Sequence, residues 1–221
     1  MADLKDTYIR VLDYLHEGME DDPVYEWILE ETTRRGLPRI QITPLQGRFI
    51  HLLVGLTGAQ NILEVGTLAG YSTMWMAKAL PAGGRLITLE ADERHAALAR
   101  EAFARAGVNE KVEVLVGPAL ATMAQLSLEE PLDMVFVDAD KPNNINYFKW
   151  AAARTRSGGL VLVDNVLMNG RVLADGASDY IQSIKAFNRY IFDNYDHNVN
   201  VIPFYKKDED NLDGIMIVQI K

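Results

Sequence analysis

Three polar residues follow two apolar runs late in the chain, and their oxygen atoms suit a hard metal ion. Asp138 follows residues 134–137, and Asp164 and Asn165 follow residues 160–163. If both runs are strands of one parallel sheet, their carboxyl ends bring these side chains together. Mg²⁺ prefers about six oxygens in an octahedron, so these three would leave roughly three positions for substrate and water. The spacing predicts an open catalytic metal site, and helix capping is the alternative for each aspartate alone.

A glycine-containing turn after an earlier apolar run suits a nucleoside cofactor. Glu64 lies in that run, Gly66 and Gly70 follow it, and glycines let a ligand approach the backbone. Glu90 ends the next run, roughly 20 residues after Gly70, where a carboxylate can accept hydrogen bonds from both ribose hydroxyls. The turn lacks the G-x-G-x-x-G pattern of NAD enzymes, and Glu64 would lie near the positive sulfonium and ammonium groups of S-adenosylmethionine (SAM). The pattern favours SAM over NAD. The alternatives are a turn without a ligand and a helix-capping role for Glu90.

Other catalytic constellations are missing. The chain has no cysteine, so disulfides, zinc-thiolate sites and thiol nucleophiles are excluded. Ser72 stands in Gly-Tyr-Ser-Thr, which does not match G-x-S-x-G, and no G-x-x-x-x-G-K-[ST] sequence occurs. The four histidines stand far apart in the sequence, at His16, His51, His95 and His197. Zinc hydrolases, serine hydrolases and nucleotide triphosphatases are therefore disfavoured.

Charge and hydropathy limit the partners. The chain carries 31 acidic and 22 basic side chains, and its net charge of −9 would repel a phosphate backbone. No apolar run approaches the roughly 20 residues that span a bilayer, and the first residues lack a hydrophobic signal core. We expect a cytoplasmic protein with no nucleic-acid partner and no membrane association.

The elements that must position the site residues follow an α/β pattern. Short β-branched runs alternate with helical stretches from residue 61 onward, at residues 62–65, 85–90, 112–116, 134–137 and 160–163. This alternation predicts a parallel sheet covered by helices on both faces. After a helix through residues 181–190, runs at 199–205 and 215–220 flank a charged turn at 206–213 that leaves no room for a helix. We expect a seven-stranded, mostly parallel sheet that ends in an antiparallel hairpin.

Three helices are expected before the sheet. The first has an apolar stripe at helical spacing that would cover the fold or a partner subunit, made of Tyr8, Val11, Leu12 and Leu15. The second begins at Asp22 and Pro23. The third begins at Thr43 and Pro44, with Gln46 completing a capping box. No linker interrupts the chain, so we expect one domain over residues 1–221, with an N-terminal helical cap at about residues 1–58.

Taken together, the motifs resemble the cation-dependent O-methyltransferases, which include caffeoyl-coenzyme A O-methyltransferases, small bacterial relatives and, more distantly, catechol O-methyltransferase. The resemblance covers nearly the whole chain. It is carried by Gln41-Ile42-Thr43-Pro44-Leu45-Gln46-Gly47, Leu63-Glu64-Val65-Gly66-Thr67 through Gly70-Tyr71-Ser72, Gly117-Pro118-Ala119, Val137-Asp138-Ala139-Asp140-Lys141, and Asp164-Asn165-Val166-Leu167 with Asn169-Gly170.

The resemblance implies a SAM-dependent methyltransferase fold of the Rossmann-like type and a role for each matching residue. Asp138, Asp164 and Asn165 match the ligands of Mg²⁺ or another divalent cation such as Mn²⁺ or Ca²⁺. Lys141 matches the general base, although a solvated surface lysine is the alternative. The acceptor would be a catechol-type small molecule, such as a caffeoyl derivative or flavonoid, and the enzyme a homodimer. The implied cofactor-binding residues are Thr43, Glu64, Gly66, Ser72, Glu90, Ala119 and Asp138.

The chain departs from the family at positions that flank the acceptor pocket. Met168 stands where plant members commonly carry tryptophan, and Ile40 stands where methionine is frequent. The charged hairpin turn is also longer than usual. These departures concern the identity of the acceptor. An NAD-dependent oxidoreductase and a noncatalytic SAM-binding protein are the competing interpretations.

Overall fold

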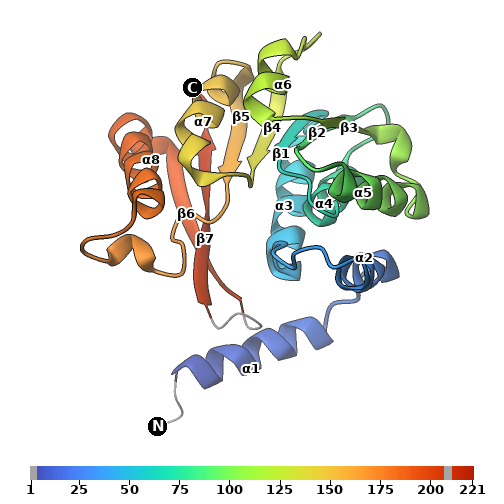
Figure 1. The fold of residues 1–221 in the computed structure, drawn as a ribbon, viewed down its shortest axis with the longest axis horizontal. Coiled ribbons are helices and arrows are strands. Elements are labelled where there is room, and N and C mark those ends of the chain that lie inside the picture. The colour runs from blue at the N-terminus through green and yellow to red at the C-terminus, as the bar shows by residue number, and fades with distance from the viewer. Residues whose placement is uncertain (1–3, 207–210) are drawn as a thin grey trace.

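The computed structural model describes residues 4–206 and 211–221. Its centre is a seven-stranded sheet in the order β3-β2-β1-β4-β5-β7-β6 (Figure 1). Strands β1 to β5 run parallel, and β7 pairs antiparallel with both β5 and β6. The strands are β1 (Asn61–Val65), β2 (Arg85–Glu90), β3 (Val112–Val116), β4 (Leu132–Val137), β5 (Thr155–Val163), β6 (Val199–Lys206) and β7 (Asn211–Gln219).

Helices cover both faces of the sheet, as the alternation of runs predicted. Neighbouring strand residues point to opposite faces, so Ile62 and Leu63 belong to two different apolar clusters. Helices α2 to α5 pack on one face and α6 to α8 on the other (Figure 1). Their bounds are α2 (Pro23–Arg34), α3 (Pro44–Thr57), α4 (Tyr71–Ala79), α5 (Glu93–Arg105), α6 (Ala119–Gln125), α7 (Asn144–Ala152) and α8 (Asp179–Tyr195), with short 3₁₀ turns η1 (Asn109–Lys111), η2 (Lys141–Asn143), η3 (Arg171–Leu173) and η4 (Asp196–Asn198).

The predicted starts of the N-terminal helices are confirmed. The Asp22 side chain accepts the Val24 N–H and caps α2. Helix α3 begins with the predicted capping box: Thr43 Oγ1 accepts the Gln46 N–H, and Gln46 Oε1 accepts the Thr43 N–H. Both α2 and α3 contribute buried side chains to the core on their face of the sheet.

Helix α1 (Leu4–Glu17) also forms where the apolar spacing predicted it. It lies beside the end of the β6–β7 pair (Figure 1), where the Tyr8 ring packs edge-on against Tyr205 of β6 with ring centroids 5.6 Å apart. Of its predicted stripe only Leu12 is buried, whereas Tyr8, Val11 and Leu15 stay exposed. Most of that apolar face therefore has no cover within the described part of the chain.

Several strand bounds differ from those predicted. Strand β5 begins at Thr155, and the terminal pair extends into the segment predicted as a turn at residues 206–213. Lys206 pairs with Asn211, so the turn prediction is wrong for both, and residues 207–210 lie outside the described residues. Ladder hydrogen bonds come from the backbone, so charged residues at the end of a sheet do not stop pairing. In residues 4–206 and 211–221 no helix is long and apolar enough to cross a lipid bilayer.

Candidate active site

A cavity of about 670 Å³ opens at the carboxyl ends of the parallel strands. Turns after β1, β2, β4 and β5 contribute to its wall, as expected for a ligand site in such a sheet. Most of the predicted site residues line it: Gly66, Ser72, Glu90, Ala119, Asp138, Lys141 and Asn165. Thr43, Glu64 and Asp164 are not lining residues. Thr43 caps α3, and its neighbours Gln41 and Ile42 reach the wall instead.

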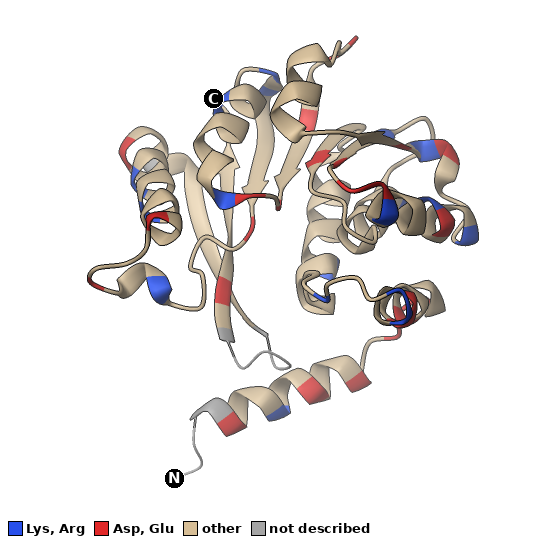
Figure 2. Ribbon diagram, in the orientation of Figure 1, with Lys and Arg blue, Asp and Glu red and all other residues tan. Residues whose placement is uncertain are grey.

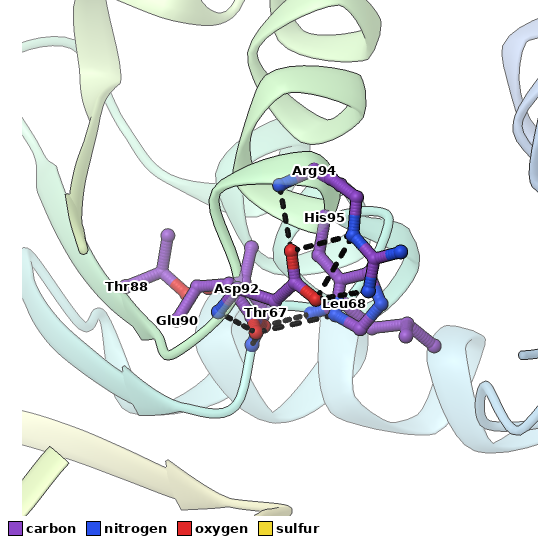
Figure 3. A network of polar contacts seen from close by, with 7 residues as sticks. All are labelled: Thr67, Leu68, Thr88, Glu90, Asp92, Arg94 and His95. Atoms are coloured by element: carbon purple, nitrogen blue, oxygen red, sulfur yellow. Dashed lines mark hydrogen bonds and ion pairs between the residues drawn. The ribbon is translucent and has the colours of Figure 1, made fainter. Parts of the chain in front are cut away.

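Glu90, the last residue of β2, is held at the cavity wall by N–H donors (Figure 3). Its carboxylate accepts the backbone N–H groups of Thr67 at 3.2 Å, Leu68 at 2.7 Å and Asp92 at 3.0 Å. His95 Nδ1 lies 3.2 Å from the same carboxylate. Glu90 thus fastens the turn after β1 to the end of β2. The cap of α5 is Asp92, so the helix-capping alternative is wrong for Glu90.

Gly66 brings the turns after β1 and β4 into contact. Its φ is 100°, a left-handed conformation that favours glycine. A Cβ atom at this position would lie 2.2 Å from the backbone oxygen of Asp138. Glycine is therefore required where the Glu90 side of the cavity meets the Asp138 side.

Glu64 lies behind the cavity wall, in the interior of the sheet. Its side chain is 0% exposed, and its carboxylate accepts hydrogen bonds from the hydroxyls of Ser72, Thr73 and Thr88. Burial raises the pKa of Glu64 to about 7, even though these three hydrogen bonds lower it. Ser72 lines the cavity, so it connects the buried carboxylate to the wall.

Asp138 and Lys141 form an ion pair on the other side of the cavity. Lys141 Nζ donates to Asp138 Oδ1 at 2.7 Å, and Lys141 is only 4% exposed. The alternative of a solvated surface lysine is therefore wrong. Burial lowers the pKa of Lys141, but the charges of Asp138 and Asp164 outweigh burial and leave the pKa above its usual value. Figure 2 shows acidic and basic residues together at the turn after β4.

Asp164 is fully buried directly after β5, next to the N-terminus of α3. Gln46 Nε2 lies 3.2 and 3.4 Å from its two carboxylate oxygens. The Gln46 amide oxygen accepts the Thr43 N–H, so the capping box directs the amide nitrogen toward Asp164. The cap position of η2 is Asp140, and that of η3 is Gly170. Helix capping, the alternative for both Asp138 and Asp164, is therefore wrong.

Asn165 lines the cavity and is held from the last strand. Its Nδ2 donates to Asp213 Oδ2 at 3.2 Å. Asp213 is almost fully buried, lines the cavity and also accepts the backbone N–H groups of Leu167 and Met168. No role was predicted for Asp213 from the sequence, because it lies inside the segment predicted as a charged turn.

The cavity wall carries two of the three departures from the family pattern. Ile40 and Met168 line it, together with Tyr180 at the start of α8. Tyr147 also lines the wall, and its hydroxyl donates to Asp140. Sequence reasoning assigned no role to either tyrosine, since a tyrosine at a helical position has no spacing that separates a wall residue from a core residue.

The residues predicted to hold a metal ion offer oxygen donors. Within the described residues, no group of three or more His, Cys, Asp or Glu side chains is placed to hold a metal ion. The set predicted from the sequence comprises two carboxylates and one carboxamide, Asp138, Asp164 and Asn165. Oxygen donors of this kind suit hard cations such as Mg²⁺.

Comparison with known proteins agrees with the resemblance. A family model described as "O-methyltransferase" matches residues 16–217. A catechol O-methyltransferase of Niastella koreensis is 45% identical over 174 residues, covering 77% of this chain and 78% of that protein. Caffeoyl-CoA O-methyltransferase 1 of Eucalyptus globulus is 30% identical over 190 residues, covering 84% and 76%.

A solved structure shares the fold over the full length. The O-methyltransferase from Bacillus cereus in complex with SAH superimposes with a TM-score of 0.89 at 37% identity, covering 99% of this chain and 100% of that one. SAH is what remains of SAM after its methyl group has been transferred. The NAD-dependent alternative is set aside by these matches. The chain belongs to the O-methyltransferase family and is a SAM-dependent methyltransferase.

Proposed function

We propose that the enzyme transfers the methyl group of SAM to one hydroxyl of a vicinal diphenol, with a divalent cation held by Asp138, Asp164 and Asn165. The observation that carries this proposal is that Glu90 and Asp138 line the same cavity. A cofactor held at Glu90 and an acceptor held near Asp138 would meet inside this cavity. The names of two relatives, catechol O-methyltransferase and caffeoyl-CoA O-methyltransferase, support this acceptor class.

The residues around Asp138 fit a divalent cation. Asp138 and Asn165 line the cavity, and the buried Asp164 stands beside Asn165 in the chain. The nitrogen of the Asn165 amide is already engaged by Asp213, which leaves the amide oxygen as its donor. When bound, Mg²⁺, Mn²⁺ or Ca²⁺ would act as a Lewis acid that lowers the phenol pKa from about 10 towards neutrality.

The remaining proposed site residues would hold the cofactor. Glu90 would accept the ribose hydroxyls, and Ala119 would offer backbone contacts beside the adenine. Ser72, supported by Glu64, would face the amino-acid end, whose ammonium and sulfonium groups are cationic. Gly66 would allow the close approach, and we propose an indirect role for Thr43, which caps α3 beside the lining residue Ile42. Fixing both reactants can supply roughly 7 to 11 kcal/mol of the barrier reduction.

Lys141 would receive the phenolic proton only after losing its own. Asp138 holds its ammonium group at 2.7 Å, and that charge raises the Lys141 pKa. A lysine that carries its proton can donate a hydrogen bond to an oxygen nucleophile and orient it, but it cannot accept the phenolic proton. We therefore rank activation of the acceptor at the oxygen ligands above base catalysis by Lys141.

The test is transfer of isotopically labelled methyl from SAM to caffeate, caffeoyl-coenzyme A and a simple catechol. Each acceptor is assayed with Mg²⁺ and with excess chelator. Labelling that the chelator abolishes, and that Asp138→Ala abolishes, is the expected result. Labelling that survives the chelator would contradict the metal role. Substantial turnover of Lys141→Ala on a catechol would exclude the general-base role.

We also propose a homodimer in which a second copy covers the apolar side of α1. Tyr8, Val11 and Leu15 are exposed there. Light scattering should give twice the mass of the chain, and Val11→Asp with Leu15→Asp should give the monomer mass. Glu17→Gln, on the same helix but outside the stripe, is the control. A monomeric native protein would overturn the proposal.

A further inference from the structure

We propose that Asp213 is a positioning residue that turns the side-chain amide of Asn165, so that the amide oxygen and not the nitrogen faces the cavity. The inference rests on the proposed metal role of Asn165. It assigns a task to a residue of β7, the strand next to β5 in the sheet, 48 positions along the chain from Asn165.

The contacts of Asp213 show how the orientation is set. Its Oδ2 accepts Asn165 Nδ2 at 3.2 Å, while its Oδ1 accepts the backbone N–H groups of Leu167 at 3.1 Å and Met168 at 3.0 Å. Its own neighbour Gly214 also donates to Oδ1, at 2.8 Å. N–H donors thus converge on a carboxylate that is only 2% exposed.

The chemistry of the two side chains leaves one arrangement. An ionised carboxylate only accepts hydrogen bonds, whereas an amide has a donating nitrogen and an accepting oxygen. The amide group of Asn165 must therefore turn its nitrogen toward Asp213. The amide oxygen of Asn165 then points away from Asp213. Since Asn165 lines the same cavity as Asp138, this oxygen is the one available to a cation there.

The backbone of the loop needs the same anchor. Asn165, Met168 and Asn169 all have positive φ, at 60°, 47° and 58°, a conformation that residues other than glycine adopt only under constraint. Asp213 holds this loop from β7. Asn188 of α8 holds it independently, because its Nδ2 donates to the Val166 oxygen at 2.8 Å. Both residues anchor the loop, but only Asp213 contacts the Asn165 amide. Replacing each of them in turn therefore distinguishes the effect of loop anchoring from the effect of amide orientation.

The decisive variant is Asp213→Asn. It keeps the size of the side chain and one oxygen for the backbone N–H groups, but it places an amide nitrogen opposite the nitrogen of Asn165. Two donors cannot pair, so the Asn165 amide would flip and present its nitrogen to the cation. Asn165→Asp in the same chain would restore a donor and acceptor pair and leave a carboxylate oxygen toward the cavity.

The experiment measures Mn²⁺ binding to the full chain, without SAM or acceptor, by electron paramagnetic resonance and calorimetry. Wild type, D213N, N165D and the double variant form a complete cycle. We expect D213N to bind Mn²⁺ about 10 to 100 times more weakly, the usual effect of removing a residue that orients a ligand. We expect N165D to improve Mn²⁺ binding more in the D213N background than in wild type, where two carboxylates would meet.

Two controls test the specificity of the effect. N188A loosens the loop without touching the Asn165 amide and should change the affinity less than about threefold. D133N alters a carboxylate that accepts the Gln60 and Asn61 N–H groups and pairs with Arg156 away from the cavity, and it should leave Mn²⁺ binding unchanged. Circular dichroism and melting temperature establish that each variant is folded.

The outcomes separate this inference from the proposed function. If wild type binds SAM but no Mn²⁺, the metal role and this inference both fail. If wild type binds Mn²⁺ and its turnover is chelator-sensitive, but D213N binds equally well, only the inference fails. Equal losses in D213N and N188A, or additive effects in the cycle, would also overturn it. If D213N does not fold, D213A decides, because it removes the acceptor of the Asn165 nitrogen: Mn²⁺ binding by D213A as tight as in wild type would refute the orientation.

Discussion

Replacing Glu64 with glutamine should change how the stability of the ligand-free enzyme depends on pH. Burial raises the pKa of Glu64 from 4.5 to about 7. Between these values the folded protein keeps a proton on Glu64 that the unfolded chain releases. The contribution of Glu64 to stability is therefore fully present below pH 4.5 and is lost as the pH rises through 7. A pKa increase of this size corresponds to about 3 kcal/mol in the free energy of unfolding.

The assay is urea denaturation of wild type and Glu64→Gln between pH 5 and pH 8. Glutamine can still pair with the hydroxyls of Ser72, Thr73 and Thr88, because hydroxyl groups both donate and accept hydrogen bonds. The stability of wild type relative to the variant should fall by up to about 3 kcal/mol across this range. Parallel curves would refute the reasoning, since they would mean that Glu64 titrates alike in both states.

The same pair of proteins tests the proposed position of Glu64 near the cationic end of SAM. A nearby cation favours the ionised carboxylate and therefore lowers its pKa. SAM should bind wild type more tightly as the pH rises from 5 to 8, and calorimetry should find this trend weakened in Glu64→Gln. SAM affinity with the same pH dependence in both proteins would place the cationic groups elsewhere.

Substitutions at Gly66, Thr43 and Glu90, two of them with a control variant, test how the segments around the cavity are held. Gly66→Ala should lose SAM binding in a titration, because the added Cβ would lie 2.2 Å from the backbone oxygen of Asp138. Gly55→Ala is the control: its Cβ would meet nothing within 4 Å, and alanine should stabilise α3 by about 1 kcal/mol. Thr43→Ala should lower the free energy of unfolding by about 1 kcal/mol through loss of the cap, and Thr43→Ser should not. Glu90→Gln should leave an N–H donor unpaired, which costs about 1 to 3 kcal/mol in urea denaturation, and should weaken SAM binding. A Glu90→Gln protein with native stability and affinity would contradict that role.

Features that depend on nearby residues were predictable from the sequence. The capping box of α3 needs only Thr43 and Gln46, three positions apart, and it forms as predicted. The alternation of apolar runs predicted a parallel sheet with helices on both faces. Because parallel strands end at one edge, it also predicted that Asp138 and Asn165 would share a site, and both line the cavity.

Contacts between distant residues were decided only by the tertiary structure. The sequence marked Glu64 as a cofactor residue, but the register of β1 with β2 pairs it with Thr88 and buries it behind the wall. Lys141 has the charge of a surface residue, yet packing buries it beside Asp138. Local sequence patterns determine which face of a helix or strand is apolar. The order of these patterns along the chain was enough to indicate the fold class of this protein. These patterns do not determine which polar groups meet across elements. Gln46 reaches Asp164 over 118 positions and Asp213 reaches Asn165 over 48, because sheet order and helix packing bring their elements together.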